Sequence, residues 1–522
     1  LDLHPDAFTC VTRALPLINA KVRRDPKAAQ AFLDVLARGR HTFRVLTLMN
    51  ESGVLGRFIP EFGRVVAQMQ FNMYHSYTVD EHTLRAVGVI ADIAEGRFKE
   101  DHPLSTSILP LIDDREALFL AMLLHDTGKG GEDGQEKAGA RAARKACERL
   151  GVNRKKTELV AWLVEHHLVM SDYAQKRDVT DPATVAAFAR IVENPERLRL
   201  LLVLTVADIR AVGPGVWNNW KGQLMRELYG ATTAIFRGGR GSDPAAAARR
   251  HQEAIAEKAR ADLTVDDPAA EAWASAMEDA YFTAFRAEEI AFHAQLARQA
   301  DIGQGAAAQA RIRADLNAAE IVVAARDRRG LFADLAVTIA SLGGNVVGAR
   351  VFTSRDGQAL DVFHVQDITG QPFGCDNAKA LGRLTAALQA AARGEVTRKE
   401  ARKAVDLGRA AAFAITPTVM LDNEASAEAT VVEASGRDRP GLLEALARTL
   451  SEAELSIQSA HIDGYGERAV DAFYVQTADG GKVEGAKRIT ALRAALMEAL
   501  EEGERAVPKS RRLQRARASV AR

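Results

Sequence analysis

One segment of this chain occurs twice, and the repetition limits the possible folds more than any other feature. Residues 320–366 read EIVVAARDRRGLFADLAVTIASLGGNVVGARVFTSRDGQALDVFHVQ, and residues 428–476 read EATVVEASGRDRPGLLEALARTLSEAELSIQSAHIDGYGERAVDAFYVQ. Each copy predicts a β-branched strand, an Arg-Asp-Arg turn that leads to glycine, an amphipathic helix, a strand, a glycine hairpin and an alternating strand. A further helix is predicted after each copy, at 377–392 and 487–501. The order β-α-β-β-α predicts two α+β modules, each with a fourth strand in its variable loop.

The repeated turn has the residues of a small-molecule site. Gly330 and Gly441 each open a helix whose free N–H groups can bind a carboxylate. Asp327 and Asp438, which precede these glycines, could hold an α-amino group. The alternative is that each aspartate only caps its helix.

With this turn, the repeat resembles the ACT domain, a regulatory α+β module of ferredoxin-like fold. The resemblance implies ACT domains at 319–395 and 428–503, with sheets that pair and bind amino acids at the interface.

A second feature lies earlier in the chain, where an apolar helix runs into an imidazole and a carboxylate. Residues 118–131 read LFLAMLLHDTGKGG, with His125 and Asp126 at the end of the helix and Gly128 and Gly130 able to stop it. A neutral imidazole nitrogen and a hard carboxylate oxygen together suit magnesium or a divalent first-row metal. For an isolated pair of this kind, a polar helix end would be the favoured interpretation.

Two more polar residues lie on apolar helices. His82 begins a helix with an apolar stripe, and Asp208 ends the apolar run 200–208. A lone buried acid needs a partner, because an unpaired buried charge is unfavourable, and a metal would be that partner. The candidate metal ligands are therefore His82, His125, Asp126 and Asp208. This ordered set resembles the HD-domain metal-dependent phosphohydrolases, which implies an all-α domain at 71–215.

Other polar residues near this set have two interpretations each. His166 and His167 could bind a second metal or the substrate phosphate, or they could form a polar helix end. Lys129 could neutralise a phosphate oxygen or be a solvated cap. His75 is favoured as a structural residue over an outer ligand. Gly134 stands where many relatives with two metals have a histidine, so one metal is favoured.

The length of the chain indicates how many domains it contains. A chain of 522 residues exceeds one core, so three or four domains are expected. The other domains predicted are a helical leader at 1–70, a helical connector at 216–318 and a disordered basic tail at 504–522. Because the chain begins with Leu1 rather than Met, we expect domains upstream of it.

The composition indicates where such a protein works. Its formal charge is zero, so no specific nucleic-acid partner is expected. No apolar run approaches the roughly 20 residues of a membrane span, and no signal peptide is recognised, so no membrane partner is expected. Three widely spaced cysteines argue for a reducing cytoplasm and against a disulfide framework.

A longer motif set has a more specific resemblance. Residues 71–83 read FNMYHSYTVDEHT, 166–171 read HHLVMS and 205–209 read TVADI. Together with the His-Asp pair and two ACT repeats, they resemble the bifunctional uridylyltransferase/uridylyl-removing enzymes of bacterial nitrogen signalling. In that family a nucleotidyltransferase domain attaches UMP to the PII signalling protein, an HD domain removes it, and the ACT pair senses glutamine, which favours removal. No transferase signature is found here, since no Gly-Gly or Gly-Ser turn precedes an Asp-x-Asp pair.

The resemblance implies metal-assisted hydrolysis of a phosphodiester with magnesium or manganese and release of UMP. Asp126 is the candidate to orient or deprotonate the water. Lys129 and either His166 or His167 are candidates to stabilise the phosphoryl charge.

Two other functions remain open at this stage. One is an HD hydrolase of a guanosine alarmone, since such enzymes also join HD and ACT modules, although they carry a synthetase domain between the two. The other is an amino-acid sensor whose HD domain is catalytically inactive, against which the intact set of four candidate ligands argues.

Overall fold

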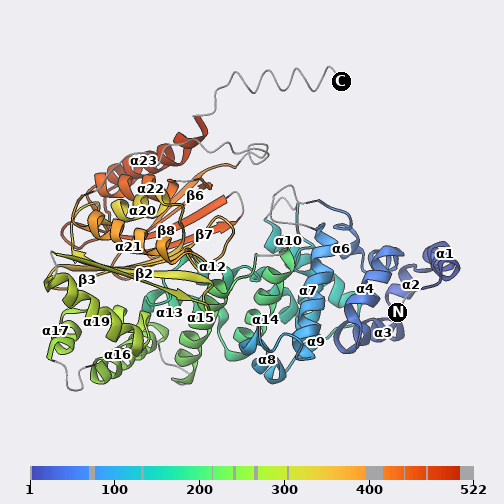
Figure 1. Ribbon diagram of the computed structural model, residues 1–522. Coiled ribbons are helices and arrows are strands. Elements are labelled where there is room, and N and C mark those ends of the chain that lie inside the picture. The colour runs from blue at the N-terminus through green and yellow to red at the C-terminus, as the bar shows by residue number, and fades with distance from the viewer. Residues whose placement is uncertain are drawn as a thin grey trace, which may run out of the picture. The chain divides into compact units, whose positions relative to one another are not determined.

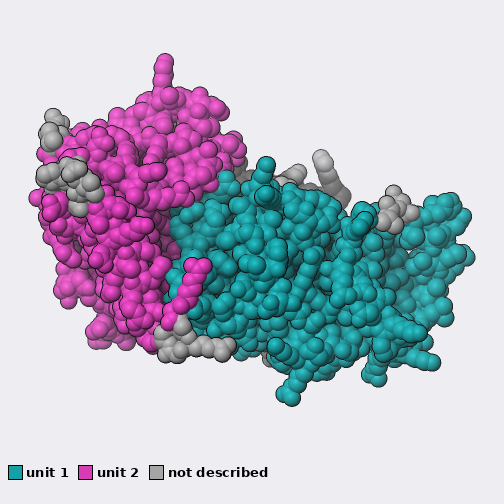
Figure 2. All heavy atoms as spheres, turned by 90° about the horizontal axis from the view of Figure 1, so that it is seen from below, with its two compact units in different colours: residues 1–172, 188–236 teal, residues 173–187, 237–522 magenta. Residues whose placement is uncertain are grey.

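The structure is a computed structural model, and it divides the chain into two compact units, drawn as a ribbon in Figure 1 and coloured separately in Figure 2. Unit 1 comprises residues 1–172 and 188–236, and unit 2 comprises residues 173–187 and 237–522. None of the described helices has the length and hydropathy needed to cross a bilayer. The residues that the structure describes are 3–69, 77–130, 134–213, 216–238, 243–263, 268–302, 305–395, 415–439, 441–465 and 468–505.

The described part of unit 1 is helical, and many of its helices begin at a side chain that accepts a backbone hydrogen bond. Asp25 accepts from the N–H groups of Lys27 and Ala28, and Asp114 accepts from that of Ala117, as N-cap residues do. The helices of this unit are α1 (Pro5–Ala14), α2 (Ala20–Arg23), α3 (Pro26–Arg38), α4 (Thr42–Glu51), α5 (Val54–Phe58), α6 (Pro60–Gly63), α7 (Val79–Ala94), α8 (Pro103–Ile108), α9 (Arg115–Leu124), α10 (Gln135–Arg149), α11 (Arg154–Glu165), α14 (Pro195–Val212) and α15 (Asn219–Arg237), with 3-10 turns η1 (Leu15–Leu17) and η2 (Leu109–Leu111). Helices α12 (Val169–Lys176) and α13 (Pro182–Val192) pass from one unit to the other.

The core of unit 1 surrounds α9, which is apolar on all sides. Every residue from 117 to 124 is at most 1% exposed, as a helix without a polar face requires. Helices α7 and α14 both pack against α9 and against each other, and α14 is buried from 200 to 207. Polar side chains at the ends of these three helices are therefore forced toward one another.

Unit 2 is built on one antiparallel sheet of eight strands in the order β1-β2-β4-β3-β7-β8-β6-β5. Strands β1 to β4 with α20 and α21 form the first module, and strands β5 to β8 with α22 and α23 form the second. The two modules join where β3 pairs with β7. The elements of the two modules are β1 (Ala306–Arg313), β2 (Ala318–Arg326), α20 (Leu331–Ser341), β3 (Asn345–Thr353), β4 (Gln358–Gln366), α21 (Ala378–Ala392), β5 (Thr418–Asp422), β6 (Thr430–Arg437), α22 (Leu442–Glu452), β7 (Leu455–Tyr465), β8 (Arg468–Thr477) and α23 (Ala486–Arg505).

The helices of the two modules share one core on one face of the sheet, here called the helix face (Figure 1). On the opposite face, here called the back face, the strands of the first module are covered by a second apolar cluster. The helices that precede the first module are α16 (Pro244–Leu263), α17 (Pro268–Ala276), α18 (Asp279–Ala284) and α19 (Ala287–Ile302).

The fourth strand of each module corrects two predictions. It precedes the repeat, as β1 and β5, instead of lying in the variable loop, and 306–313 is therefore a strand and not the end of a helical connector. Strand β1 begins with three alanines, which have low strand propensity, so its local sequence gives no strand signal. It forms because β2 supplies the whole ladder from Ala306↔Ala325 to Arg313↔Ala318.

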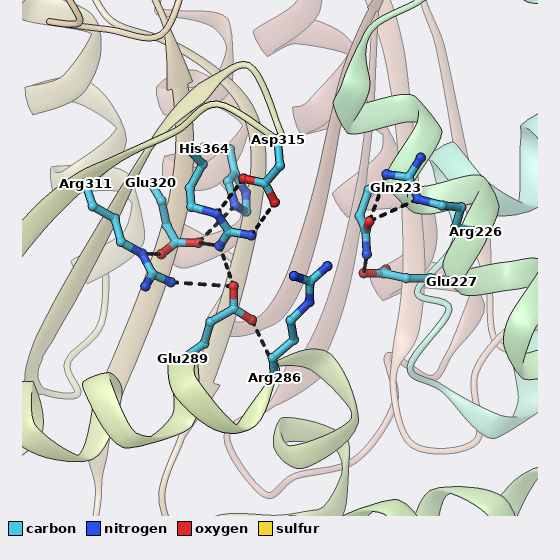
Figure 3. A network of polar contacts seen from close by, with 10 residues as sticks. Gln223, Arg226, Glu227, Arg286, Glu289, Arg311, Asp315, Glu320 and His364 are labelled. Carbon is cyan, nitrogen blue, oxygen red and sulfur yellow. Dashed lines mark hydrogen bonds and ion pairs between the residues drawn. The ribbon is translucent and has the colours of Figure 1, made fainter. Parts of the chain in front are cut away.

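Charged side chains also hold β1 in place (Figure 3). Glu320 on β2 accepts hydrogen bonds from its cross-strand partner Arg311 and, at 2.8 Å, from Nη1 of Arg313. Arg313 also pairs with Glu289 of α19. Burial would raise the pKa of Glu320, but His364 and Arg311 outweigh it and lower that pKa to about 2. Such cross-strand pairs stabilise a strand whose small side chains bury little apolar surface.

The predicted domain limits and the two units differ in three places. Residues 173–187, predicted as part of the 71–215 domain, belong to unit 2, and α15, predicted as connector, belongs to unit 1. The first two residues of the predicted basic tail 504–522 are the last two of α23, and the rest of the tail lies outside the described residues.

The loop after α9 is fixed by a close approach between two glycines. A Cβ atom at Gly128 would lie 2.0 Å from the carbonyl oxygen of Gln135 and 2.3 Å from the nitrogen of Gly139. Both neighbours are backbone atoms, so no side-chain rotation could make room. The loop that carries His125 and Asp126 is therefore packed directly on the start of α10.

We predict that Gly128→Ala destabilises unit 1, because the new methyl group must displace backbone. Overpacking of this kind typically costs about 1–3 kcal/mol, and thermal unfolding would show a lower midpoint. The matched control is Gly382→Ala on α21, where nothing lies within 4 Å of the added Cβ. Because alanine has a higher helix propensity than glycine, the free energy of unfolding of this control should rise by up to about 1 kcal/mol. Equal midpoints for the two variants would contradict the prediction.

Candidate metal centre

Three helices bring the four predicted ligands together. His82 lies on α7, His125 and Asp126 follow α9, and Asp208 lies on α14. Nε2 of His82 is 3.0 Å from Oδ1 of Asp208 and 3.8 Å from Oδ2 of Asp126. Nε2 of His125 is 3.3 Å from Oδ2 of Asp126 and 3.5 Å from Oδ1 of Asp208.

The cluster is almost fully buried. His82, His125 and Asp126 are 1%, 2% and 5% exposed, and the side chain of Asp208 is 14% exposed. One ligand atom from each of His82, His125 and Asp126 lies within 4.8 Å of the other two, a spacing that one ion can span. Two imidazole nitrogens and two carboxylate oxygens make a donor set for a divalent cation.

The orientation of His125 supports this fit. Its Nδ1 is 2.7 Å from the carbonyl oxygen of Met122, which turns Nε2 toward the carboxylates. Nε2 has no hydrogen-bond partner among the described residues, although it is buried. A backbone carbonyl on the far ring nitrogen is the usual way to orient a metal-binding histidine.

The charges in the cluster perturb one another strongly. Burial alone would lower the pKa of His125, but Asp126 and Asp208 outweigh it and raise that pKa to about 10. Burial would raise the pKa of Asp126, yet His125 and Lys129 hold it below its usual range, and histidines do the same for Asp208. Without a cation, a protonated His125 therefore balances the carboxylates.

The two histidines after α11 separate in the structure. His167 is buried, its ring centroid lies 5.3 Å from that of His125, and its Nδ1 is 2.7 Å from the carbonyl oxygen of Val164. Burial, and then the charge on His125, lower the pKa of His167. The ring of His166 instead stacks on that of Trp162, with 4.7 Å between the two ring centroids. The structure thus brings His167 to the cluster and places His166 against an indole.

Lys129 reaches the cluster from the loop that follows the His-Asp pair. Its Nζ is 2.6 Å from Oδ2 of Asp126, and its side chain is 16% exposed. It is therefore an ion-pair partner of Asp126 rather than a solvated cap. His75 lies outside the described residues.

Sequence reasoning did not single out Asp80, which fixes the start of α7. This buried carboxylate accepts a hydrogen bond from Nδ2 of Asn50 at 2.7 Å and from the N–H of Ala67 at 3.1 Å. It lies two residues before His82 and so anchors that ligand to the N-terminal helices. An acid in the first helical turn was visible in the sequence, but its partners were not.

The turn residues of unit 2 take a geometry that excludes simple capping by aspartate. Gly330 and Gly441 are the N-cap residues of α20 and α22, with φ of 79° and 81°, and neither helix has a side-chain cap. That left-handed conformation favours glycine. Asp327 is exposed, and its Oδ2 lies 3.5 Å from Oγ1 of Thr353.

The turn of the first module faces the second module. A Cβ at Gly330 would meet only Ser451 Oγ of α22, at 3.5 Å. Arg329 in the same turn pairs with Glu454 at 3.1 Å. The predicted ligand turn of the first module thus lies at the interface between the modules.

Comparison with known proteins finds family models that match three parts of the chain. The HD domain model matches residues 79–209, the ACT domain model matches 319–372, and the model of the uridylyltransferase GlnD third domain matches 1–58. The predicted fold class, a helical HD domain followed by α+β ACT modules, is therefore confirmed.

Curated relatives match along the whole chain. The bifunctional uridylyltransferase/uridylyl-removing enzyme of Caulobacter vibrioides (strain NA1000 / CB15N) is 72% identical over 523 residues, which are 100% of this chain and 56% of that protein. The enzymes of the same name from Phenylobacterium zucineum (strain HLK1) and Azospirillum brasilense are 72% and 43% identical, over 100% and 96% of this chain. This chain is a relative of the uridylyltransferase/uridylyl-removing enzymes. It spans 56%, 56% and 54% of the lengths of these three relatives.

We predict that a divalent ion bound at this centre displaces a proton, because a protonated His125 cannot ligate. Since its pKa is raised to about 10, calorimetric titration with Mn²⁺ at pH 8 should release about one proton per ion. The apparent affinity should rise about tenfold per pH unit between pH 7 and 9. The metal-free protein should lose the stability that protonated His125 contributes as the pH rises from 6.5 through about 10. An affinity independent of pH would contradict this assignment.

Proposed function

We propose that this chain hydrolyses UMP from uridylylated PII signalling protein and that glutamine regulates the reaction. The observation that carries the proposal is the buried cluster of two histidines and two aspartates inside a segment matched by the HD domain model. The name of the 72% identical relatives supplies the uridylyl-removing activity. We further propose that the protein works in the cytoplasm.

The cluster would hold one divalent ion, Mg²⁺ or Mn²⁺. Such an ion lowers the pKa of a bound water from about 15.7 toward about 7 and polarises a phosphoryl oxygen. The ligands would be His82, His125, Asp126 and Asp208.

The chain's own residues would orient the reactants. Asp126 is the candidate to position or deprotonate the attacking water, and His125 and Lys129 keep its carboxylate ionised. Lys129 and His167 would stabilise the phosphoryl charge as the tyrosyl oxygen leaves. His166, which stacks on Trp162, would instead position its neighbour His167.

The ACT modules would bind glutamine through their turns. The N–H groups at the start of α20 and α22, opened by Gly330 and Gly441, would receive the α-carboxylate. Asp327 and Asp438 would receive the α-amino group. The transferase reaction in the relatives' name is not assigned to these residues.

The test is an assay of free UMP released from uridylylated PII in the presence of Mn²⁺, with and without glutamine. The parent chain should release UMP, and glutamine should raise the rate. Asp126→Asn should lower the rate by about 10²–10⁴-fold, because it removes a ligand charge and the proposed base. The matched control is Asp101→Asn, whose carboxylate is exposed and pairs with Arg210, and it should retain the parent rate.

The same assay decides between the candidate functions. Release of UMP by Asp126→Asn at the parent rate would refute the site. A metal-loaded, folded parent that releases no UMP would refute the function and favour the alarmone hydrolase or the inactive sensor. Glutamine binding by Asp126→Asn should be unchanged, because the variant lies in unit 1 and the turns lie in unit 2.

A further inference from the structure

Corresponding strands of the two modules form the back face of the sheet, but different kinds of side chain cover them. In the first module, Ala324 and Leu360 are buried there against Trp273, Tyr281 and Phe282 of the preceding helices. The centre of this cover is apolar and closely packed, and ion pairs of Glu289 on α19 with Arg311 and Arg313 of β1 add to it. Apolar contacts have no alternative partner in water.

The back face of the second module meets a segment from far earlier in the chain. Residues 173–187, here called the strap, belong to unit 2, whereas the residues before and after them belong to unit 1. The buried apolar cluster on this part of the face is small and comprises Ala429, Val431 and Tyr474.

Polar contacts hold the strap to the second module. The N–H of Asp178 donates to the hydroxyl of Tyr474 at 2.6 Å, and the hydroxyl of Ser426 donates to the carboxylate of Asp181. His461 of β7 lies 3.9 Å from Oδ2 of Asp178. Tyr474 and Ser426 are 3% and 5% exposed, so water does not compete for these bonds in the described arrangement.

Further polar contacts join the strap to other residues of unit 2. Arg177 lies 3.8 Å from Glu433 of β6, and Nε2 of Gln252 on α16 donates to the carbonyl oxygen of Thr180 at 3.0 Å. Burial would raise the pKa of Asp178, but the nearby His461 and the hydroxyl of Thr180, which donates to this carboxylate, outweigh burial and hold the pKa below its usual range. The strap is thus bound through groups that water could also satisfy.

The strap occupies a particular place in the sequence. Helix α12 begins at Val169, whose N–H donates to the carbonyl oxygen of His166, and the strap begins within this helix at residue 173. After the strap, α13 continues to Val192 and α14 then carries Asp208. The segment held by the second module therefore lies between two residues of the metal centre, His167 and Asp208.

We infer that the strap is a latch through which the second ACT module, and not the first, regulates the metal centre. The inference rests on the proposed function, because it names the route by which a ligand of unit 2 would alter hydrolysis in unit 1. A ligand that changes the strands of the second module changes the partners of Asp178 and Asp181. The change then passes along α12 to His167 beside His125, so that the strap acts as a positioning element for this histidine.

The decisive variant removes two strap contacts and no proposed ligand. In Tyr474→Phe/Ser426→Ala, the N–H of Asp178 loses its acceptor, and the carboxylate of Asp181 loses the Ser426 hydroxyl while keeping the N–H of Ala183. Allosteric couplings are typically about 5–150-fold, so the glutamine effect on UMP release should fall at least about fivefold. The rate without glutamine and the glutamine affinity by calorimetry should stay within about twofold of the parent values.

The matched control removes a buried tyrosyl hydroxyl from the cover of the first module. Tyr281→Phe loses contacts with Trp273 at 3.2 Å and His293 at 3.1 Å, and it should keep the full glutamine effect. A full glutamine effect in the double variant, or an equal loss in Tyr281→Phe, would overturn the inference.

A second readout requires neither hydrolysis nor glutamine. Amide hydrogen exchange of the whole chain should be faster in the double variant than in the parent, both in peptides covering 173–187 and in peptides covering 160–172. Tyr281→Phe should leave both regions unchanged. Faster exchange confined to 173–187, or none, would overturn the latch even if the chain releases UMP. If the chain releases no UMP, the proposed function fails and exchange alone decides the latch.

Discussion

The structure of unit 1 depends on the burial of three apolar helices whose polar ends must share one place. Helix α9 has no polar face, and α7 and α14 pack against it. The side chains of His82, Asp126 and Asp208 therefore meet with little access to water. Two buried carboxylates close together repel each other unless cations separate them, and a protonated His125 or a divalent ion can do so. The cluster is thus a site that packing imposes and that a cation stabilises.

The sequence predicted the elements whose signals are local. An apolar run that ends in an acid indicated both the helix and the need for a partner, and the structure brings Asp208 within 3.5 Å of His82 and His125. Adjacent residues at a helix end point in different directions, so the sequence could not choose between His166 and His167. The structure places the ring of His166 against Trp162 and that of His167 beside His125.

The sequence failed where a partner element, and not the local sequence of a segment, makes the structure. Strand β1 begins with three alanines and forms because β2 supplies its hydrogen bonds and Glu320 its charge partner. The HD domain model matches 79–209 and so includes the strap, as the predicted 71–215 domain does, but the sequence of the strap contains nothing about its contacts with Tyr474 and Ser426. Contacts between residues as far apart in the sequence as the strap and the second module produce no periodic pattern in the sequence.

The two ACT modules share a topology, yet only one is built to change its cover. Releasing three large buried side chains such as Trp273, Tyr281 and Phe282 would expose apolar surface worth about 1.5–3 kcal/mol for each. A hydrogen bond between strap and strand contributes only about 0.5–1.5 kcal/mol net, because water can replace either partner. The binding energy of an amino acid can more readily offset the loss of such hydrogen bonds than the exposure of three large apolar side chains. The duplicated fold therefore gives one module a fixed place in unit 2 and leaves the other able to respond.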